Sequence, residues 1–293
     1  MHPYLLSLLL GIVEGLTEFL PVSSTAHLRI SEHLLQTNSV FPDDYWKMYT
    51  VVIQLGAILS LPYYFRSRIS KFAGTFPRGE RNDRTILNHP LTLVFIAFVI
   101  TAGPAWLLHK KIGDNLESFK VIGWSLVIGG ILMWIVDAMF GPAPAGSRHK
   151  TETMEEVSTL QAIWIGFCQI FSAVFPGTSR SMSTISAGQL AGMSRPSALE
   201  FSFFLSMPTM AAATLYDLYK NLHAHGGGTA LGRMPVNSQE WMTLAIGFIV
   251  SFLVALAVVA WFMNWVRRRG FAPFAVYRIL IGAAVLFWMA KGT

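Results

Sequence analysis

The chain has 293 residues, of which 53% are hydrophobic and 13% are charged, whereas an ordinary soluble domain carries about 25% charged residues. Because so few charges cannot cover a water-facing surface of this size, the composition excludes a soluble globular protein and indicates a membrane protein. The net charge of +6 forms no basic stripe with interleaved aromatic residues, which argues against nucleic-acid binding. The one cysteine, Cys168, excludes an intramolecular disulfide.

Two apolar stretches, residues 3–35 and 160–195, are interrupted by polar segments. In the first, Glu14 and Glu18 also argue against a cleavable signal peptide. Each stretch predicts a short helix, a polar loop and a second short helix that enter and leave the membrane on one side, since non-helical backbone at membrane depth needs protein or water around it. Three apolar segments long enough to span a membrane follow each stretch, at 48–65, 90–108 and 121–140 and at 198–219, 242–265 and 273–290. The sequence therefore predicts an all-α polytopic membrane protein with six transmembrane helices and two re-entrant helix-loop-helix hairpins.

The two interrupted stretches resemble each other when the chain is shifted by 155 residues. This shift places Gly11 on Gly166, Glu14 on Gln169, Pro21 on Pro176 and Ser24 on Ser179. Because three crossings separate the two hairpins, the second copy must be inserted upside down. We therefore predict a single membrane domain built as an inverted repeat, with halves of about 1–145 and 155–293 and with both loops near the midplane.

The lysines and arginines between the apolar segments predict the orientation of the chain. One side receives the richer set, at 66–84, 148–150 and 267–269, and the other side receives those at 47, 110–120, 220–233 and 291. The richer side is expected to be cytoplasmic, which places both termini outside.

Glu14 and Glu18 are four residues apart, so they share one face of a helix. Two carboxylates within a membrane segment are costly and predict a function, such as a divalent-cation site that also holds a phosphate through the metal. The alternative is a shallow hairpin in which both groups reach water.

Ser23, Ser24, Thr25 and His27 follow Pro21 directly. Hydroxyls and backbone N–H groups at the start of a helix favour an anion site, and His27 is a candidate base for Ser24. The alternative is that Ser23 or Ser24 only caps the next helix, which leaves the histidine unexplained.

Arg180 lies in the polar break of the second stretch, where Ser179, Ser181 and Thr184 add hydroxyls. Arginine binds phosphate through two parallel hydrogen bonds, so this group predicts a phosphate site. Alternatively, Arg180 pairs with Glu14 or Glu18 and still lies at the same site. Four other polar residues lie in apolar segments, at Gln54, Asp137, Glu200 and Asp217. Of these, Glu200 is expected nearest the site because it follows the second hairpin closely.

The motifs Gly11-Ile-Val-Glu14-Gly-Leu-Thr-Glu18-Phe-Leu-Pro-Val-Ser-Ser24-Thr-Ala-His27 and Pro176-Gly-Thr-Ser-Arg180-Ser together resemble those of the undecaprenyl-diphosphatase, or bacitracin-resistance, family. The resemblance covers nearly the whole chain. It implies hydrolysis of undecaprenyl diphosphate to the monophosphate and inorganic phosphate, which recycles the lipid carrier of cell-wall synthesis. It also implies a divalent cation, Mg²⁺ or Ca²⁺, and a site that opens to the periplasmic side of the bacterial inner membrane. A homodimer is left open.

Matched by position, the resemblance makes Glu14 and Glu18 the acidic pair, Arg180 the phosphate clamp, and Ser24 and His27 the nucleophile and base. Ser24 is favoured as the nucleophile, although the sequence leaves the choice open. Ala26 and Met182 stand where the family pattern usually has glycine, which predicts a slightly different loop geometry and an altered rate or substrate tolerance.

Three other functions compete with this one. A second lipid-phosphatase family needs a histidine and an aspartate where this chain has Ser186 and Leu190, which argues against it. A polyprenyl-phosphate transporter or flippase fits the inverted repeat, and a structural membrane protein would use the hairpins only for packing. Phosphate release separates the enzyme from the transporter.

Overall fold

The computed structural model describes residues 2–79, 84–108, 118–141, 149–222 and 232–291. These residues form α-helices and two short 3-10 turns, and no strand occurs among them. The helices are α1 (Pro3–Thr17), α2 (Ser24–Leu34), α3 (Asp43–Tyr64), α4 (Arg66–Thr75), α5 (Pro90–Leu107), α7 (Phe119–Phe140), α8 (Thr159–Val174), α9 (Arg180–Leu190), α10 (Arg195–Leu222), α11 (Ser238–Arg268) and α12 (Ala272–Lys291). The predicted all-helical fold is confirmed.

All six predicted transmembrane segments have a counterpart. Five single helices, α5, α7, α10, α11 and α12, are long and apolar enough to cross a membrane. The sixth counterpart is α3, which continues into α4 through a bend of 62°. Pro62 lies in the last turn of α3, where it removes a backbone donor and favours a bend. The predicted end of this segment at residue 65 coincides with the bend.

Most helices begin where a side chain or a proline suits the start of a helix. Ser118, Ser158 and Asn237 each accept a hydrogen bond from a first-turn backbone N–H of α7, α8 and α11, which satisfies donors that a helix start leaves open. Pro3 and Pro90 occupy the first positions of α1 and α5, where a missing N–H costs nothing.

Both interrupted stretches form a helix, a loop and a second helix, as predicted. The loops end at Ser23 and Ser179, which cap α2 and α9. Both serines have a positive φ, 75° at Ser23 and 69° at Ser179, which is uncommon for a residue other than glycine. Ser23 therefore corresponds to Ser179, and Ser24 corresponds to Arg180. The predicted match of Ser24 with Ser179 is wrong, because the second loop contains one more residue between its proline and its cap.

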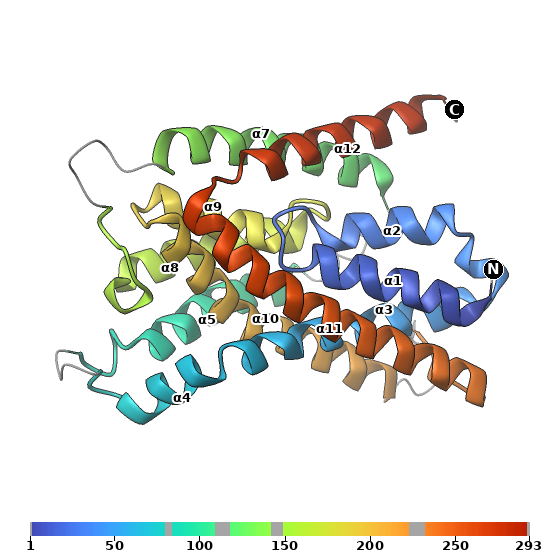
Figure 1. Ribbon diagram of the computed structural model, residues 1–293, viewed down its shortest axis with the longest axis horizontal. Helices are drawn as coiled ribbons and strands as arrows, with labels where there is room; N and C mark the ends of the chain where they lie inside the picture. The colour runs from blue at the N-terminus through green and yellow to red at the C-terminus, as the bar shows by residue number, and fades with distance from the viewer. Residues whose placement is uncertain (1, 80–83, 109–117, 142–148, 223–231, 292–293) are drawn as a thin grey trace.

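The hairpins pack in a reciprocal manner, each against a helix of the other half of the chain. Helix α1 lies along α11, α8 lies along α5, and α7 pairs with α12 (Figure 1). The contacts are close: a Cβ on Gly11 would lie 2.9 Å from the carbonyl oxygen of Gly247, and one on Gly166 would lie 2.5 Å from that of Ala97. An inverted repeat predicts such an exchange of partners.

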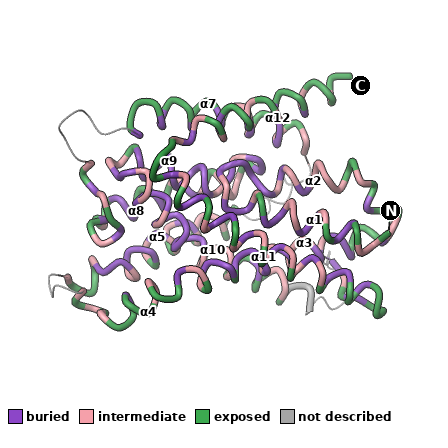
Figure 2. The backbone as a smooth tube through the Cα atoms, viewed as in Figure 1, coloured by how far each residue is buried: buried purple, intermediate pink, exposed green. Residues whose placement is uncertain are grey.

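Both termini lie at one end of the helical bundle, and α4 and the Arg-rich end of α11 lie at the other (Figure 1). The charged positions 81, 110, 111 and 148 that entered the orientation argument lie outside the described residues, as does the Lys220 side chain. Much of the outer surface of α7 and α12 is exposed, whereas most of α9 is buried (Figure 2).

Candidate functional site

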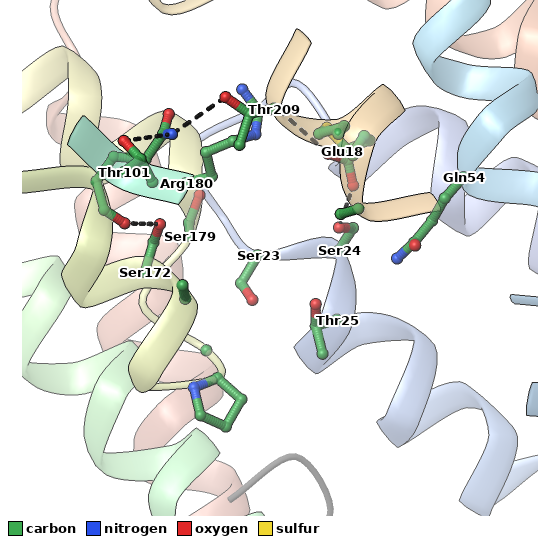
Figure 3. Close-up of a pocket in the computed structure, with 16 residues that line it drawn as sticks. Glu18, Ser23, Ser24, Thr25, Gln54, Thr101, Ser172, Ser179, Arg180 and Thr209 are labelled. Atoms are coloured by element: carbon green, nitrogen blue, oxygen red, sulfur yellow. Dashed lines mark hydrogen bonds and ion pairs between the residues drawn. The ribbon is translucent and has the colours of Figure 1, made fainter. Parts of the chain in front are cut away.

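The loop between α1 and α2 and the loop between α8 and α9 meet at a cavity of about 270 Å³. Both hairpins line this cavity, together with α3, α5 and α10 (Figure 3). Its polar lining comprises Glu18, Ser23, Ser24, Thr25, Gln54, Thr101, Gln169, Ser172, Ser179, Arg180 and Thr209. The structure therefore brings six of the predicted residues to one space: Glu18, Ser23, Ser24, Thr25, Ser179 and Arg180. Glu18 and Arg180 are 162 positions apart in the sequence.

Glu18 connects the two motifs. Its Oε2 accepts a hydrogen bond from the Ser24 hydroxyl, and its Oε1 lies 3.2 Å from Nη2 of Arg180. Nη1 of Arg180 donates to the hydroxyl of Ser206 on α10. The Glu18 and Arg180 side chains are 5% and 13% exposed, so the pair is shielded from solvent and its interaction is stronger than at a surface. A serine hydroxyl is thereby held beside a carboxylate that can accept its proton.

Helices α2 and α9 both begin at this cavity, at Ser24 and Arg180. The first-turn N–H groups of a helix lack partners within the helix and carry partial positive charge. Two such helix starts and one guanidinium therefore surround the space. This combination favours a ligand that carries several negative charges, such as a phosphate or diphosphate.

Glu14 is fully buried behind Glu18, and neither of its carboxylate oxygens has a hydrogen-bond partner among the described residues. Glu18 follows it one helical turn later on the same face of the chain. Two buried carboxylates are unfavourable unless a proton or a cation compensates them. Within the described residues, no three His, Cys, Asp or Glu side chains are grouped as a metal site. Carboxylate oxygens are the ligand type that a hard cation takes, so the donor chemistry of this pair fits such a cation.

His27 faces away from Ser24. Its Nδ1 lies 2.7 Å from the Ser23 carbonyl oxygen, and its Nε2 lies 2.7 Å from the hydroxyl of Tyr277 on α12, whose ring stacks on the imidazole. Since a carbonyl only accepts, Nδ1 donates, and in the neutral imidazole Nε2 accepts from Tyr277. The histidine lines a separate cavity between α2 and α12. Glu18 occupies the place beside Ser24 that was expected for His27.

Two further predicted residues lie beneath the cavity instead of lining it. Ser181 is fully buried with its hydroxyl 3.5 Å from the Glu18 carbonyl oxygen. The Thr184 hydroxyl donates to the Arg180 carbonyl oxygen at 2.9 Å and lies 2.6 Å from the Ser202 hydroxyl. Both therefore support the hairpin that carries Arg180.

The expectation that Glu200 belongs to the site is wrong. Its Oε1 accepts a hydrogen bond from Nε of Arg68 at 2.7 Å, and the same guanidinium donates to Glu155 at 2.9 Å. Burial alone would raise the pKa of Glu155, but the hydrogen bonds and the charge of Arg68 lower it by more, so the pKa lies below its usual value. This cluster joins α4, α10 and the turn at Met154–Glu156. Glu200 therefore serves helix packing.

The structure adds residues that the sequence did not single out. Nε2 of Gln169 donates to the hydroxyls of Thr101 and Thr209 at 3.1 and 3.2 Å. Hydroxyls in apolar helices usually bond to their own helix, so nothing in the sequence marked these two. Arg278 on α12 is fully buried and donates to carbonyls of both loops. A charged residue within the apolar segment 273–290 was a signal that could have found it.

The chain is similar to known proteins over nearly its whole length. The family model of the bacitracin resistance protein BacA matches residues 7–284. The undecaprenyl-diphosphatase of Koribacter versatilis is 62% identical over 292 residues, which cover 99% of this chain and 100% of that protein. The undecaprenyl-diphosphatase of Caldanaerobacter subterraneus is 41% identical over 283 residues, which cover 97% of this chain and 95% of that protein. The matched region includes every residue that lines the cavity.

Proposed function

The chain belongs to the family of the bacitracin resistance protein BacA, and on that premise we propose that it hydrolyses undecaprenyl diphosphate to undecaprenyl phosphate and inorganic phosphate. The reaction recycles the lipid carrier of cell-wall synthesis and confers resistance to bacitracin. The observation that carries the proposal is the cavity in which the Ser24–Glu18 pair faces Arg180 and two helix starts. This arrangement suits the attack of a hydroxyl on a bound diphosphate.

In the first step the Ser24 hydroxyl oxygen attacks the terminal phosphorus while Glu18 takes the hydroxyl proton and passes it to solvent. The bond between that phosphorus and the bridging oxygen breaks, and undecaprenyl phosphate leaves with the bonding electrons. In the second step water attacks the phosphoserine. Glu18 accepts a proton from this water and returns one to the Ser24 oxygen as inorganic phosphate leaves.

Arg180 and the first-turn N–H groups of α2 and α9 bind the phosphate oxygens. Phosphoryl transfer depends mainly on positioning and on compensation of negative charge, and the buried setting strengthens both. The hydroxyls of Ser23, Thr25 and Ser179 line the same cavity and can donate to the diphosphate.

Glu14 and Glu18 are the residues that would hold a divalent cation, Mg²⁺ or Ca²⁺, together with oxygens of the substrate. A bound cation would neutralise charge on the diphosphate and on the two carboxylates. The support is chemical: the two buried oxygens of Glu14 have no donor among the residues that the structure describes, and hard cations take such oxygens as ligands.

An apolar cavity of about 650 Å³ between α7, α8 and α9 would receive the part of the polyprenyl chain next to the diphosphate. Phe175 and Thr178 line it, while their neighbours Pro176 and Gly177 line the catalytic cavity. The two spaces therefore lie on opposite sides of one loop. The volume falls within the range of about 300–1,000 Å³ that is usual for ligand pockets.

The chain is an integral membrane protein of several helices. We place both termini outside the cytoplasm and the catalytic cavity within reach of the periplasm. The support is that both termini lie at one end of the bundle and the Arg-rich segments at the other (Figure 1). A homodimer stays a prediction.

The competing function is a transporter of the same lipid, which the pair of interrupted helices also suits. The experiment uses purified protein in liposomes with undecaprenyl diphosphate and Mg²⁺, and it measures both phosphate release and movement of the lipid between leaflets. Our proposal predicts stoichiometric phosphate release. Movement of the lipid without phosphate release would establish the transporter instead.

A further inference from the structure

Arg278 lies in the second turn of α12, between the two loops that form the catalytic cavity. Its side chain is fully buried. Nη1 donates to the Pro21 carbonyl oxygen at 3.1 Å, and Nη2 donates to the carbonyl oxygens of Gly177 and Ser125 at 3.0 and 3.1 Å. One guanidinium therefore joins both loops and α7.

All of these partners are backbone carbonyls. Within the described residues, no acidic side chain forms an ion pair with Arg278. A buried charge without a counter-ion is costly in a protein and more so in a membrane segment. An apolar side chain of similar volume would fill the space without that cost, so packing alone does not account for an arginine here.

The surrounding helices leave room for the guanidinium. A Cβ on Gly129 of α7 would collide with Nη2 of Arg278. Gly177 has a φ of 93°, which favours glycine, and a Cβ there would lie 2.8 Å from the Ile122 carbonyl oxygen. Both glycines therefore permit contacts that a larger residue would block.

The two contacted carbonyls occupy matching places in the chain. Pro21 lies three residues before Ser24, and Gly177 lies three residues before Arg180. The guanidinium is planar, with donors in a fixed fork. It therefore fixes the position of the two loops relative to each other. This in turn fixes the relative position of Ser24, which follows the first loop, and Arg180, which follows the second.

The neighbouring residue on α12 supports the same region. The Tyr277 hydroxyl bonds to His27, and His27 bonds to the carbonyl of Ser23, the cap of α2. Two consecutive residues of α12 thus contact the first loop, one of them through His27.

We propose that Arg278 is a positioning residue for phosphoryl transfer, and this inference rests on the proposed function. It holds the two loops in register so that Ser24 and Arg180 act on the same phosphorus. Displacement of reacting groups by about 1 Å can slow a reaction about 100-fold. The competing explanation is that Arg278 only stabilises the fold.

The test is Arg278→Lys, which keeps the positive charge but loses the fork. We expect kcat for farnesyl (C15) diphosphate to fall on the order of 100-fold while KM changes by less than about 3-fold, because the interaction serves the transition state. The matched control is Arg195→Lys. Arg195 is an arginine with a 23% exposed side chain, bonded to Asp137 at 2.7 Å and outside the cavity lining. The kcat of Arg195→Lys should therefore stay at the wild-type value. Thermal unfolding and size-exclusion profiles of all three proteins show whether folding is affected.

A second readout does not need turnover. Amide hydrogen exchange of residues 18–26 and 175–182 should be faster in Arg278→Lys than in the wild type, in both loops together, and unchanged in Arg195→Lys. If Arg278→Lys fails to fold, Gly129→Ala serves, since it keeps the arginine but crowds Nη2, and it should lower kcat with folding retained. Wild-type kcat and wild-type exchange in a folded variant would overturn the inference. If the wild-type protein releases no phosphate, the proposed function is refuted. The exchange comparison would still show whether Arg278 holds the two loops in register.

Discussion

Glu18→Gln is the substitution that tests the proposed chemistry most sharply. The glutamine keeps the shape of the side chain and can still accept a hydrogen bond from Ser24. It cannot take the serine proton, and it carries no charge for Arg180, whose Nη2 lies 3.2 Å from Glu18. One substitution therefore removes the base and one half of a buried ion pair.

The two losses have different magnitudes and different readouts. Removal of a general base costs about 10²–10⁴ in rate, so we expect kcat to fall about 1,000-fold. Breaking a buried ion pair costs about 3–5 kcal/mol of folding free energy. The Glu18 and Arg180 side chains are at most 13% exposed, so solvent does little to reduce this cost.

The control is Glu240→Gln. Glu240 is also a buried carboxylate, and it accepts hydrogen bonds from Arg233 at 2.8 Å on both oxygens, outside the cavity lining. Because Arg233 is 26% exposed and also pairs with Asp44, this variant should lose less stability than Glu18→Gln, and it should keep the wild-type kcat. Phosphate release from farnesyl diphosphate in detergent, at saturating Mg²⁺ and normalised to folded protein, measures both variants. If Glu18→Gln keeps its kcat to within about 10-fold, Glu18 is not the base, since a base contributes about 10²–10⁴.

Three other predictions concern the histidine, the lipid chain and the cation. His27→Gln should lose less rate than the factor of about 10²–10⁴ expected for a base, because His27 bonds to Tyr277 and not to Ser24; a larger loss in folded protein would return the base role to His27. Ser186→Leu fills part of the apolar cavity beside α9 and should raise KM for undecaprenyl diphosphate several-fold with kcat unchanged. Ala284→Leu, in the separate cavity beside α2, should leave KM unchanged. Equal KM values in the two variants would show that the polyprenyl chain does not occupy the cavity beside α9. EDTA should abolish phosphate release and added Mg²⁺ or Ca²⁺ should restore it, and turnover in EDTA would contradict a metal role for Glu14 and Glu18.

The helical architecture was predictable because its signals are local. Apolar runs of about 20 residues identify spanning helices whatever they pack against. A proline followed by polar residues, at Pro21 and at Pro176, marked the two interrupted helices. A membrane tolerates such a break only where protein or a water-filled cavity surrounds it. The same signals do not measure loop length, so the one-residue difference that pairs Ser24 with Arg180 appeared only in the structure.

The site was predictable in its members and less so in their pairing. Glu18, Ser24 and Arg180 were expected together, and the structure brings them together. The partner of His27 is Tyr277, 250 residues later in the chain, and sequence spacing carries no information on a contact of that kind. Glu200 was placed at the site because it is near in sequence, yet its partner Arg68 lies 132 residues earlier.

The most direct test of the central claim compares phosphate release by the wild type and by Ser24→Ala, purified in the same detergent and given undecaprenyl diphosphate and Mg²⁺. The account predicts one inorganic phosphate and one undecaprenyl phosphate for each substrate consumed by the wild type. It predicts a loss of at least about 1,000-fold for Ser24→Ala, as expected when a nucleophile is removed. A folded Ser24→Ala protein with wild-type phosphate release would contradict it.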